Sequence, residues 1–293
     1  MRLSLGTAQF GLAYGITNQT GQVPAQTVKG ILETAADKGI GHIDTAAAYG
    51  SAETVLAGQL GAFEVTSKIP SLEGLTPEAA RAKVASSIEE SKVKLGPGLT
   101  TILFHSAADL LRPDWQSLWE TAAAQGLPKL GVSVYTGDEV SAILGRVTPD
   151  VVQLPLNLLD QRLLDDGTLS RLKGLGCEVE ARSVFLQGVL LSAPAALPSA
   201  VQTLAPHITA IRSAAASAEA SVLDLCLSFL KLTGFVDRAV VGVTTVDELI
   251  AIHESWQRAI PAVPYQNFRV SEPHLVDPRL WRDTRQQNLK LAS

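Results

Sequence analysis

Short apolar segments alternate with longer, partly polar ones along most of the chain. The apolar segments are rich in Val, Ile and Leu, and eight of them occur one after another with a longer segment following each. Continuous apolar runs of this kind are typical of parallel sheets that are covered on both faces. We therefore predict strands at residues 2–8, 42–46, 63–69, 100–105, 129–135, 150–156, 177–184 and 238–243.

The segments between these strands carry helical patterns and residues that suit helix ends. One helix is predicted from Pro24 to Gly39, because proline suits a first helical turn and glycine suits a C-cap. Another begins at Thr76 and ends near Lys94. Further helices are predicted at 52–60, 113–125, 138–144 and about 162–176, in an alanine-rich region that ends near residue 233, and at 246–257.

Eight successive strand–helix pairs predict the fold class. They favour an α/β protein with one domain, a (β/α)8 TIM barrel that spans residues 1–260. The polar residues 261–293 are predicted to form a C-terminal extension that packs on the barrel.

Composition and charge agree with a large buried core and exclude several kinds of partner. The 293 residues are 46% hydrophobic and 18% charged, and the formal net charge is -5. An acidic chain disfavours nucleic acid and anionic membranes as partners, because both bind basic surfaces. There is no signal peptide pattern and no apolar run of about 18 residues, so we expect a cytoplasmic protein. The oligomeric state is not indicated.

The cysteine and histidine residues do not form a metal or disulfide pattern. Cys177 and Cys226 are expected to be reduced thiols. His207, His253 and His274 lack the spacing of metal ligands, so no metal is predicted.

Four polar residues stand where three neighbouring strands are predicted to end. Asp44 and Tyr49 follow the second strand, Lys68 closes the third and His105 closes the fourth. Active sites of TIM barrels lie at the C-terminal ends of the strands, so these side chains are expected to converge on one pocket. Taken singly, each has a simpler explanation as a cap, surface, rim or core residue. Their shared placement favours a joint role.

The four residue types suit the reduction of a carbonyl group. A carbonyl that receives hydride becomes an alkoxide and needs a proton donor. A phenol such as Tyr49 has an ordinary pKa near 10, and a neighbouring ammonium is expected to lower that pKa. The carboxylate of Asp44 would keep Lys68 charged, and His105 could orient the substrate oxygen by donating a hydrogen bond.

The segment DTAAAYGSAE, together with Lys68 and His105, resembles the Asp–Tyr–Lys–His tetrad of the aldo-keto reductase superfamily. The resemblance implies an oxidoreductase that transfers hydride between a nicotinamide dinucleotide and an aldehyde or ketone. Tyr49 would be the general acid, Lys68 and Asp44 would tune it, and His105 would orient the substrate. The segments GTAQFGLAYGI and RSVFLQG resemble a bacterial branch associated with sugar or polysaccharide metabolism.

The resemblance also implies a set of cofactor contacts, with two departures from the family pattern. Val134 stands where the family has an asparagine that holds the carboxamide, and Arg182 stands where most members have a tyrosine. Arg182 is expected either to stack on the nicotinamide and disfavour its oxidised form, or to form a rim salt bridge with Glu180 or with an acid of a helix. The implied contacts are Gly6, Thr7, Ser133, Gln153, Arg182, Ser183, Phe185, Gln187, Gly242, Thr244, Thr245 and Glu248.

The segment after the eighth strand leaves the identity of the dinucleotide open. NADP(H) is the default that the resemblance implies, but residues 242–249 contain no basic side chain to hold a 2′-phosphate. Glu248 would repel that phosphate and could accept from a free ribose hydroxyl, which favours NAD(H) as the alternative.

Two other functions remain open. Lys68 could form a Schiff base in a lyase, or the barrel could be a weakly active redox sensor that binds the cofactor. The substrate is expected to be a small carbonyl compound, and Ser106 stands where the family has a tryptophan. Each of four aromatic residues is expected either to line the pocket or to pack in the core: Phe10, Tyr14, Tyr135 and Phe185. No G-x-G-x-x-G motif follows the first strand, which excludes a Rossmann fold.

Overall fold

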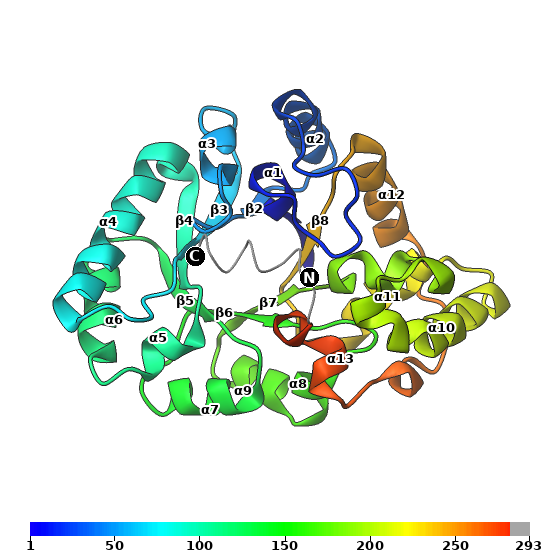
Figure 1. Cartoon of the computed structure of the whole chain (residues 1–293). Coiled ribbons are helices and arrows are strands. Elements are labelled where there is room, and N and C mark those ends of the chain that lie inside the picture. Colours follow the sequence, from blue (N-terminus) through cyan, green and yellow to red (C-terminus); the bar gives the residue numbers. More distant parts are fainter. Residues whose placement is uncertain (282–293) are drawn as a thin grey trace.

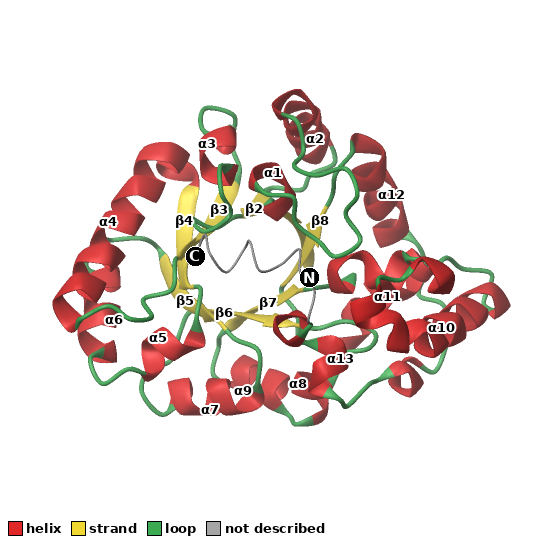
Figure 2. Cartoon of the chain, in the orientation of Figure 1, coloured by secondary structure: helices red, strands yellow, loops and turns green. Residues whose placement is uncertain are grey.

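The computed structural model describes residues 1–281, and the predicted (β/α)8 barrel is confirmed. Eight strands form one closed barrel in sequence order, and every neighbouring pair is parallel (Figures 1 and 2). The strands are β1 (Arg2–Gly6), β2 (His42–Asp44), β3 (Glu64–Ile69), β4 (Leu99–Phe104), β5 (Lys129–Ser133), β6 (Val151–Pro155), β7 (Glu178–Arg182) and β8 (Arg238–Gly242).

The helices form a ring outside the barrel (Figure 2). The longer ones are α2 (Ala25–Asp37), α4 (Pro77–Leu95), α6 (Trp115–Ala123), α7 (Gly137–Leu144), α10 (Ala205–Ser217), α11 (Val222–Thr233) and α12 (Val246–Gln257). The shorter ones are α1 (Ala8–Gly11), α3 (Ala52–Leu56), α5 (Ala107–Leu111), α8 (Arg162–Asp165), α9 (Thr168–Gly174) and α13 (Pro273–Val276). Short 3-10 turns lie at Gly96–Gly98, Leu186–Leu191, Pro194–Ala196, Ser199–Leu204, Tyr265–Phe268 and Pro278–Leu280.

Local signals in the sequence explain several helix starts. Thr76 caps α4 by accepting a hydrogen bond from the backbone N–H of Ala79, and Pro77 occupies the first turn. Thr136 and Glu139 form a capping box at the start of α7. These caps satisfy backbone N–H groups that have no partner within the helix.

Two of the predicted helices are divided in the structure. The predicted helix 162–176 is split into α8 and α9 at Gly167, whose φ of 79° is left-handed. The alanine-rich region is split into α10 and α11, because Glu219 has a φ of 51° and Ser221 forms a capping box with Asp224 that begins a new helix. The first strand also ends at Gly6 instead of Ala8, because α1 begins at Ala8.

The described part of the C-terminal extension contacts the barrel. The side-chain amide of Gln161 donates to the carbonyl oxygen of Tyr265 at 2.9 Å, and the N–H of Val270 donates to the carbonyl oxygen of Leu159 at 2.8 Å. The segment with α13 and the turn Pro278–Leu280 then reaches the mouth of the barrel, where it lines the main cavity. Residues 282–293 lie outside the described residues, so the packing of the whole extension stays a prediction.

The described residues contain neither a single helix suited to cross a membrane nor a cluster of metal ligands. Within 1–281, no individual helix has the length and apolar composition to cross a membrane, although the bent pair Ser199–Ser217 and Val222–Thr233 passes that test jointly. The same residues contain no group of three or more His, Cys, Asp or Glu side chains arranged to hold a metal ion.

Candidate active site

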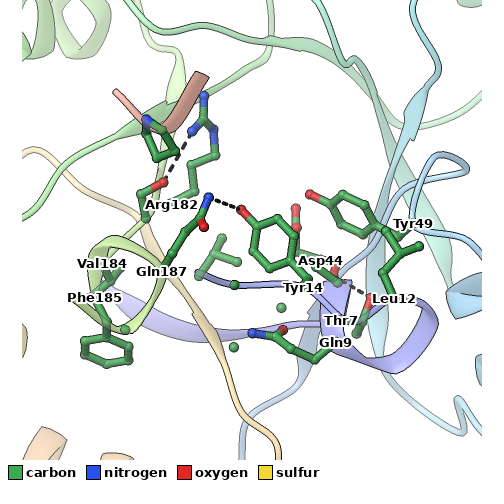
Figure 3. A pocket seen from close by; sticks show the side chains of 18 of the residues that line it. Thr7, Gln9, Leu12, Tyr14, Asp44, Tyr49, Arg182, Val184, Phe185 and Gln187 are labelled. Carbon is green, nitrogen blue, oxygen red and sulfur yellow. Dashed lines mark hydrogen bonds between the residues drawn. The ribbon is translucent and has the colours of Figure 1, made fainter. Parts of the chain in front are cut away.

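One large cavity lies at the C-terminal end of the barrel strands, where the sequence analysis placed the site (Figure 3). Its volume is about 1530 Å³, which is large enough for a dinucleotide and a small substrate together. Most of the predicted site residues line it: Gly6, Thr7, Asp44, Tyr49, His105, Ser133, Gln153, Arg182, Ser183, Phe185, Gln187, Gly242, Thr244 and Glu248. Lys68 and Thr245 do not line the cavity, but each is hydrogen-bonded to a residue that does. Lys68 donates to Asp44, and Thr245 accepts from the N–H of Glu248.

Lys68 and Asp44 form a buried ion pair beneath the cavity. The Lys68 side chain is 1% exposed, and its Nζ donates to both carboxylate oxygens of Asp44 at 2.8 Å. A third hydrogen bond, also 2.8 Å, goes to the carbonyl oxygen of Thr45. All three N–H donors of the ammonium are therefore used. A buried charge needs this degree of compensation, because removal from water is costly.

Tyr49 lies between this ion pair and the open cavity. The Lys68 Nζ is 5.1 Å from the centroid of the Tyr49 ring. The ammonium thus contacts the ring face, while its donors are taken by Asp44 and Thr45. Burial raises the pKa of Tyr49 above its ordinary value, the Asp44 charge raises it further, and the Arg182 charge lowers it. The pKa of Tyr49 is therefore raised on balance, and not lowered as the sequence predicted, because burial outweighs the nearby positive charges. The phenol is held in its protonated form.

His105 faces Tyr49 across the cavity. The two ring centroids are 5.7 Å apart and the rings meet edge to face, with an interplanar angle of 80°. Burial lowers the pKa of His105 to about 3, and the charges of Lys68 and Arg182 lower it as well. The imidazole is therefore neutral at ordinary pH and has one ring N–H to donate.

Gln153 connects the ion pair to a second buried carboxylate. Its Nε2 donates to Asp44 Oδ1 at 2.6 Å and to Glu180 Oε2 at 3.0 Å. The Oε1 atom of Gln153 is buried and has no hydrogen-bond partner among the described residues. Because a buried polar atom without a partner is rare in folded proteins, this oxygen marks a place for a donor from a ligand.

Arg182 contacts the loop after β5 instead of the predicted acid. Its Nη2 donates to the carbonyl oxygen of Val134 at 3.0 Å, and its guanidinium carbon lies 3.9 Å from the centroid of the Tyr135 ring. Glu180 is held by Gln153 and lies 3.6 Å from Arg238. The predicted rim salt bridge between Arg182 and Glu180 is therefore wrong, since Glu180 points to the buried interior of the barrel.

The loop after β7 has an unusual backbone and is joined to the loop after β1. Ser183, Leu186 and Gln187 all have positive φ angles, of 57°, 47° and 54°. Such conformations are costly for residues other than glycine and often occur at functional sites. The Oε1 atom of Gln187 accepts from the N–H of Ile16 at 3.1 Å, and its carbonyl oxygen accepts from Thr17 Oγ1 at 2.9 Å. Two loops that frame the cavity are thus held together (Figure 3).

Two glycines set the position of the Tyr49 backbone. A Cβ atom on Gly11 would lie 1.7 Å from the carbonyl oxygen of Tyr49 and 2.4 Å from the N of Ala52. Gly50 has a φ of 56°, and a Cβ there would lie 2.5 Å from the carbonyl oxygen of Gly11. Because these contacts are with backbone atoms, no other residue fits at either position without moving the Tyr49 loop.

The end of the cavity next to β8 is closed by a helix N-terminus. Thr245 caps α12 by accepting from the N–H of Glu248 at 3.1 Å. The Oε2 atom of Glu248 accepts in turn from the N–H of Thr244 at 2.6 Å and from Thr244 Oγ1 at 3.0 Å. A carboxylate of the protein therefore already occupies the positive end of this helix.

The structure adds residues that the sequence analysis did not predict and removes one that it did. Gln9 lines the cavity beside Gly242, where a Cβ atom would meet its amide at 2.8 Å. Arg279, from the C-terminal segment, also lines the cavity and lies 3.4 Å from the centroid of Tyr135. Phe10 is fully buried in the core and is not among the lining residues, so its predicted place in the pocket is wrong. Tyr14, Tyr135 and Phe185 do line the cavity.

Comparisons with known proteins identify the family. Residues 2–269 match the model of the aldo/keto reductase family, and the chain belongs to this family. No curated protein sequence matches the chain. Among solved structures, the chain is similar to the aldo-keto reductase AKR11C1 from Bacillus halodurans in its holo form, with a TM-score of 0.72, 15% identity, and coverage of 96% of this chain and 95% of that chain.

A second solved structure supports the same fold. The chain is similar to the glycerol dehydrogenase AKR11B4 from Gluconobacter oxydans, with a TM-score of 0.67, 18% identity, and coverage of 91% of this chain and 89% of that chain. Family membership supports oxidoreductase activity on carbonyl compounds, and members of the family generally use NAD(P)H.

Proposed function

We propose that this protein reduces an aldehyde or ketone with a nicotinamide dinucleotide and that Tyr49 donates the proton. The observation that carries the proposal is the Lys68–Asp44 ion pair at 2.8 Å beneath the Tyr49 ring, with the neutral His105 on the other side of the same cavity. These groups come from the ends of three neighbouring strands, which is where TIM barrels hold their catalytic residues.

The residues of the cavity fit a dinucleotide. The buried Oε1 atom of Gln153 lacks a donor among the described residues, and the amide of a nicotinamide would supply one. Ser133 lines the cavity next to it, and Gly6 and Gly242 leave space beside the backbone at the ends of β1 and β8. The dinucleotide would supply the hydride.

The side chains of the protein would donate the proton and orient the substrate oxygen. The phenol of Tyr49 is held protonated and can donate to an alkoxide as it forms. The one N–H of neutral His105 can donate to the same oxygen and orient it. When Tyr49 loses its proton, the nearby ammonium of Lys68 stabilises the phenolate.

The helix end near β8 supports a preference for NAD(H) over NADP(H). Glu248 accepts from the N–H of Thr244 there, so its charge lies at the position where a 2′-phosphate would otherwise find backbone donors. The ribose of NAD(H) would place a hydroxyl there instead, and a carboxylate can accept from that hydroxyl.

The alternative of a Schiff-base lyase has less support. A Schiff base requires a neutral amine. The Nζ of Lys68 instead donates three hydrogen bonds and is paired with both oxygens of Asp44, which favours the charged ammonium. The alternative of a redox sensor differs from the reductase only in turnover, so kinetics separate the two.

The proposal is tested by binding and by turnover. Titration with NADH and NADPH, followed by quenching of tryptophan fluorescence, should show saturable binding of at least one of them. Tyr49→Phe should leave that binding within about twofold of the wild type, but should reduce kcat for a broad set of aldehydes by about 100-fold or more, because the proton donor is lost. Saturable binding without turnover in the wild type would favour the sensor. Lack of binding to both dinucleotides would overturn the proposal.

A further inference from the structure

The two basic residues that line the cavity differ in whether their charge is paired. Five charged residues line the cavity: Asp44, Glu139, Arg182, Glu248 and Arg279. Asp44 pairs with Lys68 at 2.8 Å. Arg279 pairs with Asp277 at 2.7 Å and lies 3.7 Å from Glu139. Among residues 1–281, Arg182 has no carboxylate within ion-pair distance.

The remaining carboxylate of the cavity belongs to its other end. Glu248 is held at the N-terminus of α12, after β8, by its bonds to the N–H and hydroxyl of Thr244. Arg182 instead lies at the end of β7 and faces Val134 and Tyr135 on the loop after β5. The positive charge of Arg182 is therefore unpaired among the described residues. It lies apart from the N-terminus of α12, where the adenosine part of the dinucleotide is proposed to bind.

The guanidinium of Arg182 also has donors to spare. It carries five N–H groups. Two acceptors are present, the carbonyl oxygen of Val134 at 3.0 Å and Ser183 Oγ at 3.4 Å, which leaves three N–H groups without an acceptor among the described residues. One face of the guanidinium packs on the Tyr135 ring, and this contact fixes its plane. A fixed guanidinium plane with free donors matches the geometry of a carboxylate.

The charge of Arg182 acts on the reacting end of the cavity. Burial is the main cause of the raised pKa of Tyr49 and of the lowered pKa of His105. The Arg182 charge lowers both pKa values, so it opposes burial at Tyr49 and adds to it at His105. Arg182 is therefore electrostatically coupled to the same two side chains that are proposed to contact the carbonyl oxygen. A substrate held at Tyr49 and His105 would have this guanidinium nearby.

We infer that the substrate is a carbonyl compound that carries an anionic group, and that Arg182 is the residue that selects it. The inference rests on the proposed function, because it concerns the substrate of the same site. Two of the free N–H groups of Arg182 would donate hydrogen bonds to the two oxygens of a substrate carboxylate. The carbonyl oxygen of the same substrate would lie between Tyr49 and His105. A phosphate ester is also anionic but differs from a carboxylate in charge and shape, so the two kinds of anionic group need separate tests.

The test compares substrates that differ only in charge. Carboxybenzaldehydes with the carboxylate in the meta or para position would be compared with the carbamoylbenzaldehydes of the same pattern, which are neutral and of similar shape. For the wild type, kcat/KM should favour the charged member of at least one pair by about 10- to 100-fold, as expected for a charge-assisted hydrogen bond that the amide cannot form. Glyceraldehyde 3-phosphate against glyceraldehyde forms the phosphate arm. A preference confined to that arm would identify a phosphate as the anionic group.

Variants of Arg182 show whether it is the source of this preference. Arg182→Gln should reduce the ratio of charged to neutral kcat/KM to within about threefold of one, and Arg182→Lys should keep part of it, because the lysine keeps the charge but not the fork. Arg212→Gln, on the exposed surface of α10, removes an equal charge outside the cavity and should leave the ratio unchanged. The ratio cancels any effect of Arg182 on the cofactor, since both substrates use the same one.

Direct binding gives a readout that does not depend on turnover. The product of the best charged substrate, a hydroxymethylbenzoate, should bind the wild-type protein in calorimetry at least 10-fold more tightly than the matching benzamide, and Arg182→Gln should remove the difference. If the wild type reduces aldehydes but treats charged and neutral members equally, the inference is wrong and the proposed function stands. If no aldehyde of either kind is reduced, the proposed function itself fails.

Discussion

At the scale of single residues, the proposed preference for NAD(H) depends on Glu248. Its carboxylate accepts from the N–H of Thr244 at 2.6 Å, beside the cavity. We expect Glu248→Gln to tighten NADPH binding about 5- to 10-fold, because a negative charge next to the 2′-phosphate is removed while the amide oxygen still accepts the same hydrogen bonds. NADH binding should change by less than about twofold. Fluorescence titration of both dinucleotides measures the effect.

A neighbouring acid provides the control for this prediction. Asp247 lies in the same first turn of α12 and is exposed like Glu248, but it does not line the cavity. Asp247→Asn removes the same charge from the same helix end as Glu248→Gln does. It should leave the affinities for NADH and NADPH unchanged. If it tightens NADPH binding as much as Glu248→Gln does, the effect comes from the overall charge and the specific role of Glu248 is wrong.

The residues at the strand ends, and the pairing of Asp44 with Lys68, could be predicted from sequence, while some of the side chains around them could not. Asp44, Lys68 and His105 are polar groups at the ends of apolar runs, and the barrel geometry alone brings them together. Glu180 gave no comparable signal, because alternation along a strand does not reveal that its side chain reaches the amide of Gln153. Arg279 lies in a polar tail, and nothing in its local sequence indicates a contact with Tyr135.

At the scale of elements, β7 carries two glutamates with opposite electrostatic environments. Burial and, after it, the Asp44 charge raise the pKa of Glu180 to about 7. Glu178 is partly buried, which opposes ionisation, but its hydrogen bonds to Lys129 and Arg238 outweigh this and lower its pKa below the ordinary value. The two residues therefore affect the pH dependence of stability in opposite directions.

Glu180 should make the wild type less stable as pH rises. Its pKa is higher in the folded state than the ordinary value of 4.5, so its contribution is fully present below pH 4.5 and is lost as pH rises through about 7. Glu180→Gln cannot ionise and should not show this loss. Between pH 5 and pH 8 the variant should therefore become more stable relative to the wild type. The difference in free energy of unfolding should grow by up to about 3 kcal/mol. Urea denaturation across this range measures the difference.

Glu178 gives the opposite sign and serves as the matched comparison. Because its folded-state pKa is lowered, its contribution is present above pH 4.5 and is lost as pH falls through the folded-state pKa. Glu178→Gln should therefore be less stable than the wild type near neutral pH and approach it in acid. Parallel curves for both variants would contradict the assignment of these environments.

The order of the elements could be predicted from the pattern, but several of their ends could not. Apolar runs of strand length fix eight strands because each must be buried between the barrel interior and a helix. The break between α10 and α11 escaped prediction, because alanine favours helix on both sides of it. It depends on the left-handed conformation of Glu219 and on the capping box of Ser221 with Asp224.

At the scale of the whole molecule, the C-terminal segment is part of the cavity wall. Trp281 is 6% exposed and lines the cavity, whereas its neighbour Leu280 is 52% exposed. We expect Trp281→Ala to lower the free energy of unfolding by about 2–4 kcal/mol, because a buried aromatic side chain is removed. Leu280→Ala should change it by less than about 0.5 kcal/mol. Denaturant unfolding of both variants is the measurement.

The comparison between these two variants tests how firmly the segment is attached. Val276 is also buried, and Arg279 bridges to Asp277 and lies near Glu139 of α7, so several contacts act together. If Trp281→Ala were as stable as Leu280→Ala, the segment would contribute little to the folded barrel. The cavity would then have to be regarded as open on that side.

The contact between Gly11 and Gly50 limits how this enzyme can change during evolution. Both positions lie outside the cavity lining, and each is fixed by the backbone atoms of the other loop. Random mutagenesis should therefore find inactive variants at two sites that no ligand touches. Such variants would still fold and still hold a nucleotide, but their phenol would stand out of reach of the substrate. A lineage that lost the reaction and kept the fold could do so by gaining one methyl group.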